Sequence, residues 1–180
     1  VWGARAGAEG ASGPAGARVI VSHTAFAPGH LGCHKTTSRL AYDLGREEAR
    51  AAGADEALLV SPAGDVFEGA ASNLFVVLSG SGVGIPPRVV VSPGVVTPPL
   101  SADVLPGVTR AIVIGLCREL GIAVRESAVS LETLRWAEEV FVTNSVQEVL
   151  PLALVAERAV PAREIGMRLL AAYRERVAAG

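Results

Sequence analysis

Short apolar segments with the character of buried strands are spread along the whole chain, and helical patterns separate only some of them. They are ARVIVS (17–22), EALLVSP (56–62), the arm VFEGAASNLFVVL (66–78) and EVFVTN (139–144). Because such runs are bounded by turn residues, they predict the strands of a sheet. Strict alternation of strand and helix is missing. The order therefore predicts an α/β (α+β) domain with a largely antiparallel, barrel-like sheet and flanking helices.

Helical periodicity predicts longer helices beside these strands. The first covers 36–52, is ended by Gly53, and would turn Leu40, Ala41 and Leu44 to one apolar side. A long loop is expected over 79–94, a second helix over 110–120, a short one from Ser130 to Trp136, edge strands within 149–160, and a final helix opened by Pro161.

The first residues, 1–17, differ in composition from the rest of the chain. They are dense in Gly and Ala and begin without Met, which is typical of a linker or of the remnant of a missing N-terminal domain. The remaining residues, 18–180, are long enough and apolar enough to bury one substantial core. We therefore expect one domain over 18–180.

Charge and cysteine usage exclude several classes of protein. A formal net charge of -2 without a basic block argues against a nucleic-acid or anionic membrane partner. No apolar run approaches the roughly 20 residues that span a bilayer, and no signal peptide is visible. Cys33 and Cys117 are far apart and lack metal-ligand spacing, so we expect no metal and a reducing, cytoplasmic setting.

Lys35 is the only lysine in a chain that carries fifteen arginines. Drift in a GC-rich genome would replace lysine by arginine wherever arginine serves equally well. Arginine cannot lose its proton near neutral pH, so it cannot act as an amine nucleophile or form a Schiff base, whereas a buried lysine can. Lys35 is therefore a candidate for chemistry.

Glu68 lies among apolar and small residues in VFEGAASN, with no cation nearby in the sequence. A buried carboxylate there would need a protonated partner, and a pyridinium N–H would satisfy it. The alternative is an exposed strand glutamate that pairs with an arginine. Near Lys35, His23, His30 and His34 are expected to be exposed loop histidines; a thiol nucleophile at Cys33 with a histidine base is a further alternative.

Two short segments could bind a phosphate. Gly107, Val108 and Thr109 combine a glycine, backbone N–H groups and a hydroxyl at a helix start, which is a ready anion site. The alternative is an ordinary helix cap by Thr109. Asn144 and Ser145 belong to the run TNS that closes a predicted strand, and Ser145 could supply a second hydroxyl; the alternative is a plain turn.

Taken together, these segments resemble the class IV aminotransferase family, the fold-type IV group of pyridoxal-phosphate enzymes. The resemblance covers 18 to about 155 and runs through HKTTSRL, DEALLVSPAGDVFEGAASNLFVV, TPPL, LPGVTRAIVIGLCRELGIAVRE and AEEVFVTNSVQEVLPL. It implies pyridoxal 5'-phosphate as cofactor, a small-molecule substrate and a homodimer. Family members also resemble one another over an additional N-terminal α/β domain of about a hundred residues, ordinary domain size, which is not found here.

The resemblance also implies roles for single residues. Lys35 would be the catalytic lysine that forms the Schiff base, and Glu68 the carboxylate on the pyridine nitrogen. Val108 and Thr109, with Gly107 beside them, would contact the phosphate. Ser145, next to Asn144 in the TNS run, would match the second phosphate-binding hydroxyl.

The branch of the family is less clearly marked. Branched-chain aminotransferases usually place a tyrosine five positions after the lysine, and this chain has Leu40 there. Leu40, Arg39 in a KTxxR arrangement and the TNS run favour 4-amino-4-deoxychorismate lyase, which forms 4-aminobenzoate and pyruvate for folate biosynthesis. The alternatives are a branched-chain or D-amino acid type transaminase of amino acid metabolism, or an inactive truncated member that acts as an interaction module.

Overall fold

The computed structural model describes residues 17–79, 94–160 and 162–179. The predicted connector before Ala17 and nearly all of the predicted loop at 79–94 lie outside these residues. The strands are β1 (Ala17–Ala25), β2 (Glu56–Val60), β3 (Asp65–Gly69), β4 (Asn73–Leu78), β5 (Gly94–Thr97), β6 (Val124–Glu126), β7 (Val129–Ser130), β8 (Glu139–Asn144), β9 (Glu148–Val155) and β10 (Arg158–Ala159). The helices are α1 (Leu40–Ala51), α2 (Val108–Glu119), α3 (Leu131–Arg135) and α4 (Glu164–Ala179), with 3-10 turns η1 (Gly29–Leu31) and η2 (Leu100–Ala102).

The described strands form one sheet that closes on itself. Its order is β6-β5-β4-β8-β9-β1-β2-β3-β7, and an additional pairing between β3 and β4 joins β1, β2, β3, β4, β8 and β9 into a ring. β1 runs parallel to β2 and β9, and β5 runs parallel to β6, while the other pairings are antiparallel. The predicted largely antiparallel, barrel-like sheet is confirmed. The expectation that 149–160 holds only edge strands is wrong for β9, because it pairs with β8 on one side and β1 on the other.

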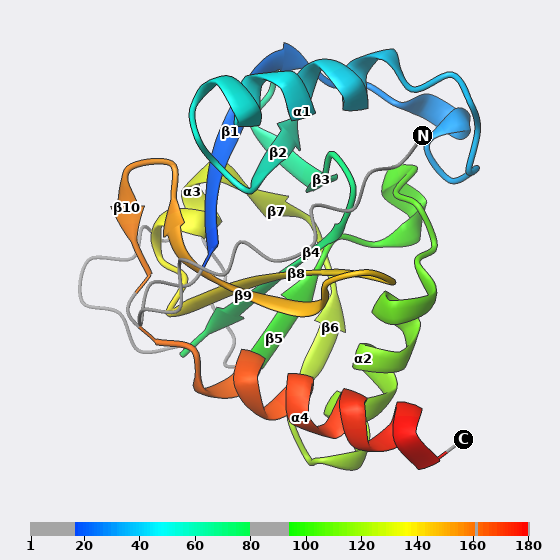
Figure 1. Ribbon diagram of the computed structural model, residues 1–180, viewed down its shortest axis with the longest axis vertical. Coiled ribbons are helices and arrows are strands. Elements are labelled where there is room, and N and C mark those ends of the chain that lie inside the picture. Colours follow the sequence, from blue (N-terminus) through cyan, green and yellow to red (C-terminus); the bar gives the residue numbers. More distant parts are fainter. Residues whose placement is uncertain (1–16, 80–93, 161, 180) are drawn as a thin grey trace.

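Alternation along the strands divides the core between the barrel interior and its outer faces. In β4 and β8, Leu74 and Val142 belong to the interior cluster, whereas Phe75 and Phe141 pack outward against α2 and α4. On another outer face, α1 covers β1 and β2 (Figure 1). Within the described part of the chain, no helix has the length and apolar character needed to cross a membrane.

α1 begins later than predicted and buries a different face. It starts at Leu40, because the segment before it forms local bonds such as Thr36 N–H to the His34 carbonyl. Leu40 is 74 % exposed and Leu44 is 44 % exposed, so their predicted burial is wrong. The helix instead packs on small residues such as Gly45, where an added Cβ would lie 2.9 Å from Leu59 Cδ2.

Replacing Phe141 with alanine tests the outer core. Phe75 and Phe141 are opposite partners on β4 and β8, their ring centroids lie 4.9 Å apart, and both are fully buried. We expect Phe141→Ala to lower the free energy of unfolding by about 3 to 5 kcal/mol, measured by urea denaturation. Val146→Ala, at a site 81 % exposed in the turn after β8, should stay within about 0.5 kcal/mol of wild type. Equal effects of the two changes would contradict this account of the core.

Candidate functional site

A β-bulge points Glu68 toward α1. Leu59 pairs with Glu68, but the next residue of β2, Val60, pairs with Val66, so Phe67 is an extra residue in β3. Bulges change the direction of the side chains that follow them. Val66 therefore packs inside the barrel, whereas Glu68 lies on the outer face with Leu59, under the start of α1. Glu68 is 3 % exposed, so the exposed-glutamate alternative is wrong.

Among the described residues, only neutral hydrogen-bond donors hold the Glu68 carboxyl. The Tyr42 hydroxyl donates to Oε1 at 3.1 Å, while the Leu105 N–H and the Asn73 amide donate to Oε2 at 3.3 and 3.4 Å. Burial raises the pKa of Glu68 to about 7, although the Tyr42 and Leu105 hydrogen bonds and the charge of Arg39 lower it. None of the salt bridges formed by the described residues involves Glu68. The site is therefore a buried acid that a protonated nitrogen would suit.

The start of α2 lies next to this acid. Asn73 also donates to the Leu105 carbonyl at 2.9 Å, and a Cβ on Gly107 would lie 2.1 Å from Asn73 Oδ1, so only glycine fits there. Gly107 is the N-cap of α2 and offers no side-chain cap. Thr109 is buried inside the first turn, so the alternative of a Thr109 cap is wrong. The first N–H groups of α2, beginning at the exposed Val108, are suited to an anion.

The TNS run reaches the same region through strand pairing. Thr143 pairs with Asn73, is buried, and has a hydroxyl without a hydrogen-bond partner among the described residues. Asn144 Oδ1 accepts from the N–H groups of Val146 and Gln147 at 2.9 and 2.7 Å, so its side chain holds the β8–β9 turn, as the plain-turn alternative expected. Ser145 is exposed in that turn.

Lys35 is exposed, and its expected burial is wrong for this chain. Its loop is nevertheless packed against the segment that leads to Leu105. His30 Nδ1 lies 3.6 Å from Asp103 Oδ1, and a Cβ on Gly32 would lie 1.9 Å from the Asp103 carbonyl oxygen. The loop of Lys35 therefore contacts Asp103, and the Glu68 carboxyl accepts from Leu105, two residues further along the chain. One short segment supports both.

The alternatives around Lys35 find no support. His23, His30 and His34 are exposed as expected, although His23 lies in β1 rather than in a loop. Across 17–79, 94–160 and 162–179, no three His, Cys, Asp or Glu side chains are grouped to hold a metal. The Cys33 thiol donates to the His30 carbonyl oxygen at 3.0 Å, and no imidazole among the described residues hydrogen-bonds to it as the base of a thiol nucleophile would.

Two side chains that contact Glu68 were not anticipated from the sequence, those of Tyr42 and Asn73. Tyr42 lies three residues after Arg39, and this spacing places both on one side of the first turn of α1. Asn73 is a polar residue at the start of an apolar strand.

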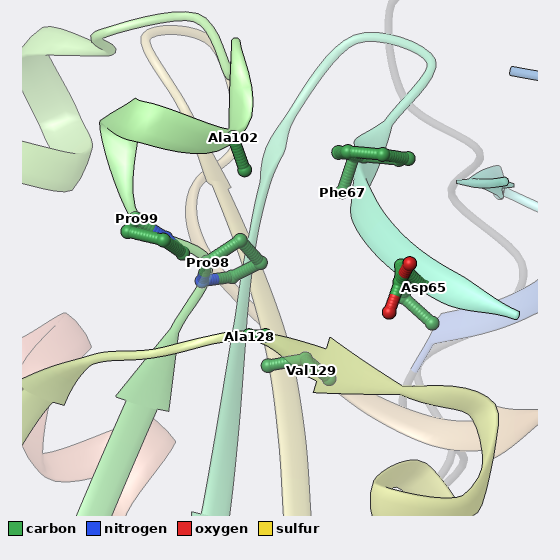
Figure 2. Close-up of a pocket in the computed structure, with 8 residues that line it drawn as sticks. Asp65, Phe67, Pro98, Pro99, Ala102, Ala128 and Val129 are labelled. Atoms are coloured by element: carbon green, nitrogen blue, oxygen red, sulfur yellow. The ribbon is translucent and has the colours of Figure 1, made fainter. Parts of the chain in front are cut away.

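A separate pocket of about 200 Å³ lies beside β3 and contains none of the predicted site residues (Figure 2). It is lined by Asp65, Val66, Phe67, Pro98, Pro99, Ala102, Ala128 and Val129.

Comparisons with known proteins point to one family. The sequence profile described as "Amino-transferase class IV" matches residues 8–155. The branched-chain-amino-acid aminotransferase of Escherichia coli (strain K12) is 38% identical over 108 residues, which are 60% of this chain and 31% of that protein. The D-alanine aminotransferase of Bacillus licheniformis is 33% identical over 110 residues, 61% of this chain and 34% of that protein.

Solved structures agree with these relatives. The branched-chain amino acid aminotransferase of Escherichia coli superposes with a TM-score of 0.76 at 32% identity, and the match covers 88% of this chain and 52% of that chain. A further branched-chain amino acid aminotransferase, complexed with N-(5'-phosphopyridoxyl)-L-glutamate, superposes with a TM-score of 0.79 at 32% identity. The chain thus spans about half the length of these structural relatives and about a third of the curated ones.

The pH dependence of stability tests the environment of Glu68. Its pKa is about 7 in the folded chain against an ordinary 4.5, so the folded state binds this proton more tightly. Stability from Glu68 is therefore fully present below pH 4.5 and lost as the pH rises through 7. Relative to Glu68→Gln, wild type should lose on the order of 3 kcal/mol of unfolding free energy across this window, measured by urea denaturation.

The matched control is Glu157→Gln, which removes an exposed glutamate from the β9–β10 turn. Its difference from wild type should not change between these pH values. A constant difference between wild type and Glu68→Gln would show that Glu68 titrates normally and would contradict the buried-acid description.

Proposed function

The chain belongs to the class IV aminotransferase family, and from this premise we propose that it binds pyridoxal 5'-phosphate and takes part in amino-group transfer. Enzymes of this family are pyridoxal-phosphate-dependent, and their substrates are small molecules. The observation that carries the proposal is the buried Glu68 carboxyl, which lacks a salt-bridge partner among the described residues and lies beside the uncapped start of α2. The domain assignment for 18–180, the homodimer and the cytoplasmic location stay predictions.

The residues present fit the two ends of this cofactor. Glu68 would accept a hydrogen bond from the protonated ring nitrogen, which would satisfy the buried acid and lower its pKa. The N–H groups of Val108 and Thr109, beside Gly107, would bind the phosphate, together with the Ser145 hydroxyl. Asn144 would contribute by shaping the turn that presents Ser145. Pyridoxal phosphate supplies an aldehyde that condenses with amines and a ring that accepts carbanion charge.

Lys35 would supply the amine that holds the cofactor and then carries a proton at the substrate carbon. Since its side chain is exposed in this chain, exclusion of water from that amine requires further polypeptide over this face. Glu68 would keep the ring nitrogen protonated throughout, because an ionised buried carboxylate strongly favours a cationic partner.

For the reaction itself, the relatives favour the transaminase alternative over the lyase. The named relatives are branched-chain and D-alanine aminotransferases. We propose a transaminase that uses a branched-chain amino acid or a D-amino acid as donor. The lyase remains the second candidate because of one sequence feature. Leu40, preceded by Arg39, stands at the position where branched-chain aminotransferases usually carry tyrosine.

Reductive trapping tests the role of Lys35. Borohydride added to the protein with pyridoxal phosphate should attach the cofactor to Lys35, identified by peptide mass mapping, and Lys35→Arg should remove this label. Glu68→Gln should reduce the label several-fold, because specific binding needs the acid. Non-specific reaction of pyridoxal phosphate with an exposed amine would not depend on Glu68.

Moving the single lysine provides the matched control. The double variant Lys35→Arg, Arg135→Lys carries one exposed lysine on α3 instead. It should gain little label at position 135. Equal labelling at positions 35 and 135, or labelling at 35 that ignores Glu68→Gln, would overturn the proposed cofactor site.

Acceptor dependence distinguishes the two reactions. A transaminase should convert an amino donor continuously only when a 2-oxo acid is added, because each turnover must return the amino group. A lyase should release pyruvate from 4-amino-4-deoxychorismate without an acceptor. Chromatography of 2-oxo acids from L-leucine, L-valine and D-alanine measures this. Acceptor-independent pyruvate release would reverse the assignment.

A further inference from the structure

The first turn of α1 carries a pair of side chains that contact the Glu68 region together. Arg39 is the N-cap residue of α1 and Tyr42 follows three positions later. The Arg39 guanidinium lies over the Tyr42 ring, 4.9 Å from its centroid, and donates to the Ala70 carbonyl at 3.1 Å. The Tyr42 hydroxyl donates to Glu68 Oε1. Arg39 thus ties the tyrosine to the loop that follows Glu68.

The Tyr42 ring is held on a second side. Phe26, 2 % exposed, meets it edge to face with ring centroids 5.1 Å apart. A ring fixed by a cation on one side and an aromatic neighbour on another has little freedom to rotate away. Its hydroxyl is therefore preorganised at the carboxyl of Glu68, as a supporting residue of a functional site should be.

The two oxygens of Glu68 are occupied unequally. Oε2 accepts from the Leu105 N–H and from the Asn73 amide, whereas Oε1 accepts only from Tyr42 among the described residues. Each carboxylate oxygen can accept two hydrogen bonds, so Oε1 keeps one open acceptor position. We propose that Tyr42, held by Arg39 and Phe26, is a positioning residue that directs Oε1 of Glu68 at the cofactor's ring nitrogen. This inference rests on the proposed function.

The electrostatics of the contact agree with its geometry. The titratable and charged groups that face Glu68 are Tyr42 and Arg39 from α1 and Glu56 from β2. Burial raises the pKa of Glu68 most, and the Tyr42 bond is the largest influence that lowers it. Burial, and then the charge of Glu68, raise the pKa of Tyr42, so the phenol keeps its proton and stays a donor.

The consequence concerns the charge of Glu68 near neutral pH. With Tyr42 in place, the carboxyl loses its proton more readily and can accept from a ring N–H. Without the hydroxyl, Glu68 would hold its own proton to higher pH and compete less well for the cofactor nitrogen. Tyr42 would therefore set the pH range in which the acid can work.

A titration of the cofactor-free chain tests the contact. Carboxyl-labelled glutamate allows ¹³C NMR to follow Glu68, whose signal is assigned by its loss in Glu68→Gln. Tyr42→Phe keeps the ring and removes only the hydroxyl, so the Glu68 midpoint should rise by about one pH unit. Tyr173→Phe, on the buried face of α4, should leave the midpoint unchanged. An unchanged or lower midpoint in Tyr42→Phe overturns the proposal.

Trapping on Lys35 tests the direction of Oε1. The pH profile of borohydride labelling should shift in Tyr42→Phe relative to wild type and Tyr173→Phe, which a purely structural role would not produce. Normal labelling of Tyr42→Phe with an unshifted pH profile overturns the proposed role of Tyr42 but not the proposed cofactor site. If wild type takes no label, the proposed function and this orientation both fail, whatever the NMR midpoint shows.

Discussion

The structure depends on one short pairing, that of Glu68 in β3 with Asn73 in β4. It closes β1, β2, β3, β4, β8 and β9 into a ring, while β6 and β7 remain the ends of the strand order. The same pairing places the acid beside the amide that also binds the Leu105 carbonyl. The same strand pairing therefore closes the barrel and positions the residues of the site. A change that opened one would disturb the other.

Three glutamates are buried in the described chain with different degrees of satisfaction. Glu139 accepts from two N–H groups at the start of α4, both at 2.9 Å, and Glu56 accepts from Ala57, Ala71 and Ser72 at 2.8 to 3.2 Å. Both hold the backbone. The contacts of Glu68 are mostly longer, 3.1 to 3.4 Å, and burial raises its pKa to about 7. Its burial costs stability that its own bonds do not offset, a pattern typical of a site prepared for a ligand.

Several large apolar side chains in the segments beside the site are exposed. Leu31, in the same loop region as the exposed Lys35, is 64 % exposed, and Leu100 in η2 and Val108 at the start of α2 are 41 % and 71 % exposed. The supports of the site are nevertheless complete here, because the His30–Asp103 and Glu68–Leu105 contacts link the loop, η2 and the barrel wall.

Local signals in the sequence determined most secondary-structure elements and identified the candidate functional residues. Ser130, where a short helix was predicted to begin, is the N-cap of α3. Gly53 ends α1 as predicted and Gly121 follows α2, both with positive φ, and β8 has the predicted bounds. These features depend on neighbours within a few residues, so periodicity and capping reveal them. The single lysine and the acid in an apolar arm were visible for the same reason.

Contacts between distant segments decided the rest. The bulge at Phe67 turned Glu68 outward, the approach of α1 to the sheet selected Gly45 and left Leu40 in solvent, and only the fold brought Tyr42 to the acid. A strand's two faces and a helix's packing side depend on which surface arrives to cover them. That choice is made by pairings between residues tens of positions apart, which no local pattern encodes.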